Sequence, residues 1–486
     1  MKFFSKILFV FCVLIKFLYT QSPEILWEKL YGEFDYTEIG FCVQQTSDGG
    51  FIISSRTESH ILLLPHLWLI KTDANGDTIW TRNILINQYA EGVSIQQTMD
   101  EGYVICGRVI SPDSLSFDVL LLKTDEYGNT LWVKIFGGDS FDSGYSVKQT
   151  GDGGYIVVGS IDVGNSYYDV WLIKADENGD SIWTRTYGGD KDDNGYSIEE
   201  TDDGGFIIVG SLRTLDLDQD VWLLKTDSSG DTLWTKTYGG IKNDVGNSVQ
   251  QTSDGGYIIV GRTRIVDNIY VYLIKTNENG DTLWTKIYGG TESQEGMSVQ
   301  QTTDGGYIIG AVTESFNVNY TAIWLIKTDS LGDTLWTKIL DRHYHDEARG
   351  ECLRQTKDNG YIVSGSTYPA GSYLKRDVWL IKIAPDSNVV GNEHPTNIPI
   401  NYDLSQNHPN PFNTTTKIKY QIPTLSFVTL KVYDVLGNEI ETLVREEKRT
   451  GTCEVTWYAE NLPSGVYFYQ LKAKNFFETK KMVLLR

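Results

Sequence analysis

The sequence predicts an all-β protein, namely a seven-bladed β-propeller closed by its own N-terminal strand and followed by a small immunoglobulin-like β-sandwich. Three observations carry this prediction. Most of the chain repeats one segment, each copy contains two β-hairpin patterns, and one strand of the last copy is displaced to the N-terminus. Repeats of about 20–50 residues are typical of propellers, solenoids and related arrays.

The repeat is visible in a threonine that ends the first strand of every copy. It recurs at Thr46, Thr98, Thr150, Thr201, Thr252, Thr302 and Thr356. The steps between successive positions are 52, 52, 51, 51, 50 and 54 residues, so the chain holds seven copies.

The copy at 246–286 shows the strand pattern most clearly. SVQQT and YIIVG flank an Asp-Gly-Gly turn at 254–256, and VYLIK and TLWTK flank an Asn-Gly turn at 279–280. Such pairs supply the positive φ angles of tight hairpin turns, so each copy is predicted to form four strands. Seven four-stranded units indicate a propeller rather than a sandwich.

The order of the strands predicts a closed ring. A fourth-strand segment, Ile25–Gly32, precedes any first strand, and the last copy ends after its third strand, Asp377–Lys382. The N-terminal segment therefore completes the last blade, whereas a solenoid would need capping repeats. The small polar SVQQT strand suits a wet central channel. The repeated Trp and Tyr residues suit a packed core rather than a ligand cage.

The N-terminus resembles a targeting segment. Lys2 and Lys6 precede a short apolar run, Ile7–Ile15, which cannot span a bilayer and is typical of a secretory signal peptide at 1–21.

Composition divides the remainder of the chain. The propeller is predicted for 22–384, and residues 385–403, rich in Pro and Asn, are predicted to form a linker. Residues 404–486 contain short alternating strands separated by turns, which predicts the sandwich.

The charge of the chain limits its partners. With a formal net charge of −22 over 486 residues, the protein lacks the basic footprint that nucleic-acid binding needs. No second segment is apolar enough to insert into a membrane. We expect a soluble monomer outside the cell, where the charge favours solubility.

Two cysteines occupy equivalent positions in the first and last copies, Cys42 and Cys352. These copies become neighbours when the ring closes, so a disulfide clasp is one alternative. Two separate thiols are the other, because equivalent positions on adjacent blades usually lie too far apart for a disulfide. Cys106 replaces a core valine and is expected to be a buried thiol.

The terminal domain carries several short motifs. They include Pro409, Asn410, Pro411 and Phe412 in a PNPF motif, a VTW motif at 455–457, Gly465 and Tyr467 in an SGVY motif, and Lys480 and Lys481 before the final MVLL. Together they resemble the type A C-terminal sorting domain of type IX secretion substrates. The resemblance implies export by the type IX secretion machinery, via the periplasm, to the surface or surroundings of a Gram-negative bacterium. The repeats also resemble units common among such cargoes, for which no activity is implied.

Repeated acids mark the loops that join fourth strands to first strands. Asp142, Asp193 and Asp244 each lie two residues before a loop glycine. Clustered oxygens can hold calcium, but these loops lack the dense alternation of a dedicated site, and Asx turns explain the same residues. We therefore predict no metal and no cofactor, with calcium as the alternative. The histidine cluster at 343–346 is interpreted as a solvated loop rather than a zinc site.

The loops between second and third strands differ in every copy, whereas the hairpin turns are nearly identical. Connections of a meander alternate between two faces, so the variable loops and the acidic loops should share one face. Rigid scaffolds display function on such loops. Five tyrosines there could stack on sugar rings or on a partner surface: Tyr167, Tyr168, Tyr320, Tyr368 and Tyr373.

These features predict a binding protein for a glycan or another protein. No GxSxG, HExxH or Walker motif occurs, so we expect no enzyme. Two alternatives remain: an extracellular enzyme acting on polysaccharide or peptide, and a passive structural protein of the cell surface.

Overall fold

The structure, a computed structural model, describes the chain outside residues 1–21, 33–35, 60–64, 87–88, 112–115, 165–166, 215–217, 241, 317, 319, 343–351, 369–374, 387–401, 423–425, 449–450, 460–461, 475 and 486. The predicted signal peptide and most of the predicted linker lie outside these residues, so the domain limits stay predictions. The described part of the chain holds no helix able to cross a membrane.

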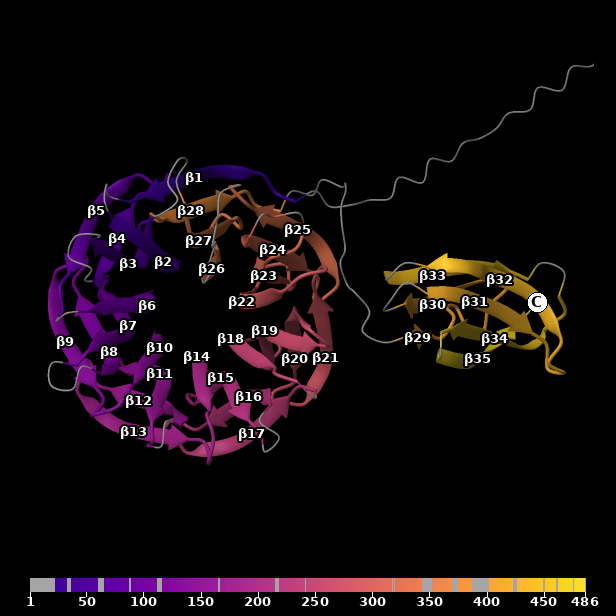
Figure 1. The fold of residues 1–486 in the computed structure, drawn as a ribbon, viewed down its shortest axis with the longest axis horizontal. Helices are drawn as coiled ribbons and strands as arrows, with labels where there is room; N and C mark the ends of the chain where they lie inside the picture. Colours follow the sequence, from indigo (N-terminus) through magenta and orange to yellow (C-terminus); the bar gives the residue numbers. More distant parts are fainter. Residues whose placement is uncertain are drawn as a thin grey trace, which may run out of the picture.

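Seven four-stranded antiparallel sheets follow one another around a ring (Figure 1), which confirms the predicted propeller. Six blades are continuous in sequence: β2 (Tyr36–Gln45), β3 (Phe51–Ser59), β4 (Pro65–Thr72), β5 (Thr78–Ile84); β6 (Ala90–Gln97), β7 (Tyr103–Ile110), β8 (Phe117–Thr124), β9 (Thr130–Phe136); β10 (Ser143–Gln149), β11 (Tyr155–Asp162), β12 (Tyr168–Ala175), β13 (Ser181–Tyr187); β14 (Asn194–Glu200), β15 (Phe206–Arg213), β16 (Gln219–Thr226), β17 (Thr232–Tyr238); β18 (Val245–Gln251), β19 (Tyr257–Ile265), β20 (Asn268–Thr276), β21 (Thr282–Tyr288); β22 (Gln294–Gln301), β23 (Tyr307–Thr313), β24 (Ala322–Thr328), β25 (Thr334–Leu340).

The seventh blade joins the two ends of the repeat region. Its strands are β26 (Cys352–Gln355), β27 (Tyr361–Thr367), β28 (Asp377–Ile383) and β1 (Ile25–Tyr31), in the order β1-β28-β27-β26. The ladder between β1 and β28 runs antiparallel from Ile25 opposite Ile383 to Tyr31 opposite Val378. The predicted closure by the N-terminal strand is confirmed.

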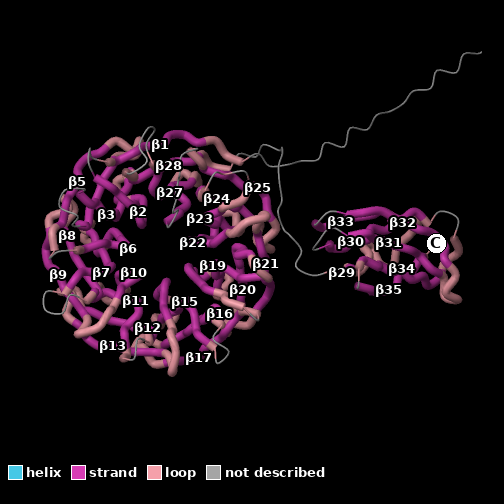
Figure 2. Tube along the Cα trace, in the orientation of Figure 1, coloured by secondary structure: helices cyan, strands magenta, loops and turns pink. Residues whose placement is uncertain are grey.

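The strands are ordered from the axis outward. The first strand of each blade lies nearest the open centre and the fourth lies at the rim (Figure 2). Second and third strands are buried on both faces; in β19, for example, Ile258, Ile259 and Val260 are fully buried. Such near-continuous apolar runs are expected where neighbouring blades cover a strand on both sides.

Rim tryptophans hold adjacent blades together. Each packs on the aromatic residue that opens the second strand of the next blade, with ring centroids 5.7–6.3 Å apart, and the seven pairs are Trp27–Phe51, Trp80–Tyr103, Trp132–Tyr155, Trp183–Phe206, Trp234–Tyr257, Trp284–Tyr307 and Trp336–Tyr361. The pair between Trp27 and Phe51 spans the closing blade and the first. The interpretation of these rings as core is confirmed.

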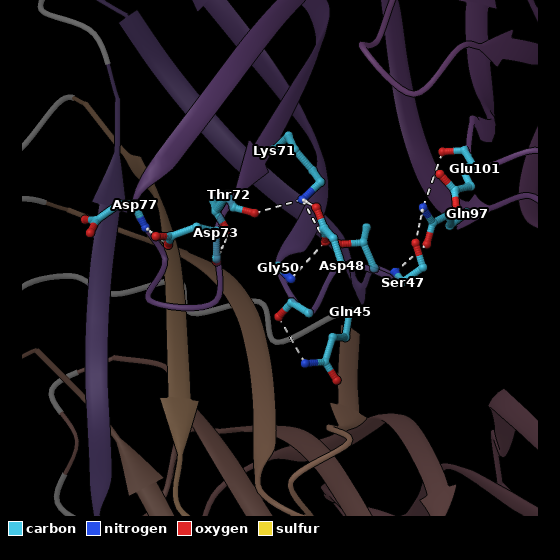
Figure 3. Close-up of polar contacts among 12 residues, drawn as sticks. Gln45, Ser47, Asp48, Gly50, Lys71, Thr72, Asp73, Asp77, Gln97 and Glu101 are labelled. Carbon is cyan, nitrogen blue, oxygen red and sulfur yellow. Dashed lines mark hydrogen bonds and ion pairs between the residues drawn. The ribbon is translucent and has the colours of Figure 1, made fainter.

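A buried lysine braces the turn between the first and second strands of every blade. In the first blade, Lys71 Nζ lies 2.8 Å from Asp48 Oδ2 and donates to the carbonyl of Thr72 (Figure 3). Asp48 Oδ1 also accepts from the Gly50 amide, so one carboxylate fixes both the turn and the third strand. The equivalent pairs are Lys123–Asp100, Lys174–Asp152, Lys225–Asp203, Lys275–Asp254, Lys327–Asp304 and Lys382–Asp358. We call the side that carries these turns the hairpin face.

The terminal region forms a β-sandwich with its own core. One sheet has the order β29-β30-β33 and the other β32-β31-β34-β35. The strands are β29 (Asp403–Leu404), β30 (Thr415–Ile422), β31 (Ser426–Tyr433), β32 (Glu439–Lys448), β33 (Gly451–Tyr458), β34 (Gly465–Ala473) and β35 (Phe476–Leu484). Alternate residues of both sheets meet in one apolar cluster around Trp457 and Tyr469.

The structure confirms the expectation for Cys106 but does not test the one for Cys42 and Cys352. Cys106 is fully buried, and burial raises the pKa of its thiol far above the ordinary value. Cys42 is also buried. The side chain of Cys352 lies outside the described residues, so the pairing of Cys42 with Cys352 stays a prediction.

Candidate functional site

The described parts of the variable loops lie with the acidic loops on one face of the propeller, opposite the hairpin face. The amides of Asp142, Asp193 and Asp244 each donate to a carbonyl at the entry of a third strand, at an N···O distance of 2.6 Å. These bonds tie each four–one loop to a neighbouring two–three loop. We call this side the loop face. One predicted loop is shorter than expected, because residues 263–269 are mostly strand and turn tightly at Val266, whose φ is 57°.

The three predicted aspartates lie beneath the surface of the loop face. Asp142 is 2% exposed, and its two carboxylate oxygens accept from the amides of Asp162 and Gly138 at 3.0 and 3.2 Å. Asp193 and Asp244 are also buried and accept from loop amides in the same way. The aspartates therefore brace the loops, and their part in ligand binding stays a prediction.

Each of these aspartates faces a second carboxylate. A Cβ on Gly239 would lie 2.3 Å from Asp220 Oδ1 and 2.5 Å from Asp244 Oδ2, so these two oxygens are at most 4.8 Å apart. Asp118 with Asp142, and Asp169 with Asp193, are arranged in the same way. The Oδ1 atoms of Asp118, Asp169 and Asp220 have no hydrogen-bond partner.

Burial raises the pKa of Asp142 to about 6, against the two amide hydrogen bonds, and the charge of Asp118 adds to the rise. Burial also raises the pKa of Asp220. At the junction of the fifth and sixth blades, the equivalent glycine, Gly289, faces the neutral residues Gln294 and Tyr270 instead. The fold therefore does not require the acid pairs.

The predicted tyrosines differ in exposure. Tyr320 is 52% exposed and Tyr167 is 36% exposed, so both present ring surface to solvent. Tyr168 is half-buried in β12, and Tyr368 is half-buried with the Arg376 guanidinium 5.1 Å from its ring centroid. Tyr373 lies outside the described residues.

A charged and aromatic cluster at the inner edge of the loop face was missed from the sequence. Glu91, at the start of β6, is 5% exposed and receives hydrogen bonds from Arg56 at 3.0 Å, Arg108 at 2.6 Å and the Tyr89 hydroxyl at 2.6 Å. The Arg108 guanidinium also lies 4.8 Å from the ring centroid of Phe117. Both carboxylate oxygens of Glu91 are thus held by charge-assisted bonds, which are the strong kind.

A similar but smaller cluster lies four blades further along the chain. Glu295 pairs with Arg262 at 3.1 Å and accepts a hydrogen bond of 2.9 Å from the Asn247 amide. Between the two clusters, Tyr145 and Tyr196 pack edge-to-face with centroids 5.3 Å apart. Burial raises the pKa of Tyr196 to about 12, so its hydroxyl is a neutral donor at physiological pH.

These residues depart from the repeat at fixed register positions. Glu91 and Glu295 precede the first-strand glycine, where the other copies carry Ile, Ser, Asn, Val or Arg. The arginines of the cluster occupy a second-strand position where the other copies carry Ser or Val. This departure from the repeat was the sequence signal that could have identified the cluster. We call Arg56, Tyr89, Glu91, Arg108, Tyr145, Tyr196, Asn247, Arg262 and Glu295 the inner cluster.

In the described part of the chain, no group of three His, Cys, Asp or Glu side chains lies close enough together to hold a metal ion. The histidine cluster at 343–346 lies outside the described residues. The inner cluster instead offers neutral phenols, an amide, paired charges and ring faces, a set of groups suited to recognition by hydrogen bonding and stacking.

The motifs of the terminal domain converge on its last strand. Phe412 is buried against Trp457, with centroids 5.6 Å apart, and exchanges backbone hydrogen bonds with Val483 and Leu485. Asn410 Oδ1 accepts from the Val483 amide at 2.9 Å. Tyr467, opposite Met482, packs on Trp457 as well. The PNPF segment therefore clamps the C-terminal strand.

The remaining motif residues of that domain lie closer to its surface. Pro409, Pro411 and Lys481 are exposed, and Lys480 and Gly465 are half-buried.

Residues 407–485 match the protein family described as Secretion system C-terminal sorting domain. This match confirms that the terminal domain is a type IX sorting domain and indicates that it interacts with the type IX secretion machinery. No curated protein sequence matches the chain.

Several solved structures resemble the fold. Sqt1 from Chaetomium thermophilum has 10% sequence identity and a TM-score of 0.42, over 74% of this chain and 100% of that one. A puromycin hydrolase has 9% identity and a TM-score of 0.39, over 79% and 59% of the two chains. An ancestral GH74 enzyme has 11% identity and a TM-score of 0.38, over 93% and 64%. At these scores the likeness carries no argument about function.

Proposed function

We propose that this protein is an exported binding module that holds a glycan or a protein ligand on the loop face, over the inner cluster. The observation that carries the proposal is the position of Glu91. Its carboxylate is buried among two guanidiniums and a phenol although the repeat does not require it there. Departures from the local pattern of a repeat are expected at functional positions.

The surroundings of the inner cluster suit a ligand of mixed polarity. Phe141 is 51% exposed, and its ring centroid lies 6.1 Å from that of Phe117, which contacts Arg108 of the cluster. Tyr320, on the same face, is 52% exposed and offers a second flat apolar surface. Aromatic faces beside fixed hydrogen-bonding groups are the usual means by which a rigid site orients a ligand. Preorganised side chains also lower the entropy cost of binding.

An enzymatic role has weaker support. The carboxyl pair of Asp118 and Asp142 has the raised pKa that general acids use, but its members are only 5% and 2% exposed. A general acid must come within hydrogen-bond reach of the group it protonates. These carboxyls are covered by their own loops, so binding is the better supported function.

A ligand screen tests the binding function. We expect the purified protein to bind members of a glycan array or a panel of extracellular proteins, and to release no product from polysaccharide or peptide substrates. For any ligand found, Glu91→Gln and Tyr320→Ser should weaken affinity by about tenfold, the loss of one charge-assisted hydrogen bond or one stacked ring.

A matched variant on the other face controls this test. Tyr127 is 56% exposed and lies in a turn of the hairpin face, so Tyr127→Ser removes a similar ring without touching the loop face. Equal losses from Tyr127→Ser and Tyr320→Ser, or product release in the screen, would contradict the proposal.

We further propose that the sorting domain delivers the propeller to the outer surface or the surroundings of a Gram-negative cell, by way of the periplasm. In a host with type IX secretion, removal of residues 404–486 should leave the protein in the periplasm. Fractionation with an antibody against the propeller measures this distribution. Normal surface display of the truncated protein would refute the assignment.

A further inference from the structure

A polar cavity of about 120 Å³ lies on the propeller axis between the first strands. Its wall includes one side chain from the same position of every blade: Gln44, Gln96, Lys148, Glu199, Gln250, Gln300 and Arg354. We call these seven residues the channel ring. A single water needs roughly 10–15 Å³ of such space, so the cavity has room for a small solute with its hydration.

Hydrogen bonds between blades fix the orientation of the channel-ring amides. Gln96 Oε1 accepts from the Gln149 amide of the next blade at 2.7 Å. Gln44, Gln250 and Gln300 accept from the next blade in the same way, at 2.6–2.7 Å. Because the backbone N–H is the donor, the side-chain atom facing it must be the carbonyl oxygen. The NH₂ groups of these four amides are therefore left to the channel.

Serines add a second tier of donors. Ser94, Ser197 and Ser248 accept from backbone amides of the next blade at 3.3–3.4 Å through their hydroxyl oxygens. Each hydroxyl keeps its own proton for another acceptor. The inner strands thus present mainly donors to the axis.

The two exceptions to this arrangement are both cations. Lys148 and Arg354 occupy the channel-ring position in the third and seventh blades, and neither side chain can accept a hydrogen bond from the next blade. Each substitution therefore gives up the inter-blade bond that glutamine accepts elsewhere. Arg354 Nη1 instead donates to the Leu353 carbonyl at 3.0 Å and to the Ser298 hydroxyl of the preceding blade at 3.4 Å. The two cations lie three blades apart by the shorter path, on opposite sides of the channel.

The channel ring also contains one anionic side chain, which offsets only part of the positive charge of the two cations. Glu199 lies 3.6 Å from Lys148, and its other carboxylate oxygen accepts from the Gln251 amide. Two cations and one anion leave the ring with a net positive charge inside a chain of net charge −22. We propose that the channel ring binds a small oxyanion, such as phosphate or sulfate, between Lys148 and Arg354 and the amide NH₂ groups.

Calorimetric titration of the purified full chain with inorganic phosphate and with sulfate, at constant ionic strength, tests this site. We expect saturable binding of one anion per chain. Arg354→Gln and Lys148→Gln each install the residue that four other blades already carry, so folding should be retained. Each should weaken binding by about tenfold, the effect of one lost charge-assisted contact.

Two further variants separate the site from a general effect of charge. Glu199→Gln removes the one carboxylate of the channel ring and should tighten binding by about threefold or more. Lys236→Gln makes the same charge change on the outer strand β17, where Lys236 pairs with Asp281, and should leave affinity unchanged.

Three results would overturn the proposal. They are no saturable binding by the unmodified protein, unchanged affinity in both cation variants, and equal weakening by Lys236→Gln. Circular dichroism of each variant confirms that the comparison is made between folded proteins.

Discussion

The two faces of the propeller treat buried charge in opposite ways. On the hairpin face, every blade pairs a buried lysine with a turn aspartate, as in Lys225 with Asp203 at 2.9 Å. On the loop face, three blades place two carboxyls against each other, as in Asp220 with Asp244, without a cation beside Asp220 Oδ1. The lysine–aspartate pairs of the hairpin face therefore stabilise the fold, whereas the carboxyl pairs of the loop face destabilise it.

The pKa shifts of the aspartates also have opposite directions on the two faces. Burial alone would raise the pKa of Asp203, but hydrogen bonds from Lys225, Thr201 and Gly205 lower it to about 2. Burial raises the pKa of Asp142 to about 6, and the charge of Asp118 adds to the rise because none of the described lysines lies there to offset it. Strained or unfavourable arrangements persist where surrounding structure holds them, and they concentrate at functional sites.

Ring closure supports both faces, so its removal should have the largest effect. Deletion of residues 22–32 exposes the edge of β28 and removes Trp27 from Phe51. We expect a loss comparable to the whole folding free energy, on the order of 5–15 kcal/mol, with aggregation through the open edge. Thermal melting and size-exclusion chromatography measure both effects. Leu26→Ser, at a site 49% exposed in the same strand, should melt near the unmodified protein.

The next largest effect is expected on the hairpin face. Asp203→Ala leaves the ammonium of Lys225, which is 3% exposed, without its carboxylate partner. The loss should be about 2 kcal/mol in urea unfolding, typical of a buried polar group that loses a partner. The exposed neighbour Asp202 provides the control, because Asp202→Ala should change stability little. Similar losses in both variants would mean that the lysine brace is not what stabilises the turn.

The pH dependence of stability should show both faces at once. Asp142, with a folded pKa of about 6 against about 3.9 unfolded, contributes stability that is complete below pH 4 and is lost as pH rises through 6. Asp48 and Asp152, with folded pKa values of about 2, contribute stability that is present above pH 4 and is lost as pH falls toward 2.

Urea unfolding between pH 3 and pH 8 should therefore give a maximum between about pH 4 and pH 6. A maximum at or above pH 7 would contradict the raised carboxyl pKa values of the loop face.

The smallest expected effect is a gain in stability rather than a loss. Asp220→Asn removes one charge of the Asp220–Asp244 pair and should stabilise the protein at pH 7.5, on the order of 1 kcal/mol. The neutral pair of Gln294 and Tyr270, between the fifth and sixth blades, is the natural precedent. Glu278→Gln, at an exposed turn of the hairpin face, should leave the melting temperature unchanged. Destabilisation by Asp220→Asn alone would show that the pair contributes to folding.

Much of the fold was predictable because the repeat states each strand seven times. The displaced strand Ile25–Tyr31 showed ring closure by counting alone, and the Asp-Gly-Gly turns marked the hairpins. The lysine brace was visible as a lysine in every apolar third strand, yet its partner lies about 23 residues away in the turn, as Asp48 does for Lys71. Sequence spacing does not state such a contact.

The sequence predicted which face carries the candidate site, but not which residues form it. Composition does not reveal exposure, so Asp142 looked like a surface ligand although it is buried under its loops. Glu91 meets Arg56 of the preceding blade because of the offset between neighbouring sheets, which no single copy encodes. The amide orientation in the channel ring likewise arises between blades. The strand pairing within each blade could be predicted, whereas the side-chain contacts that build the site had to be observed.

The pairing of β1 with β28 also makes closure of the ring depend on synthesis of the whole propeller. The first strand has no partner until the ribosome has made Asp377, almost the entire repeat region later. Pairing across such a separation is slow, since the intervening chain must first be ordered. A chain that terminates early would keep an open sheet edge, which is a template for aggregation and a mark of an unfinished protein for proteases. Closure of the ring therefore distinguishes chains that contain the whole propeller from shorter fragments.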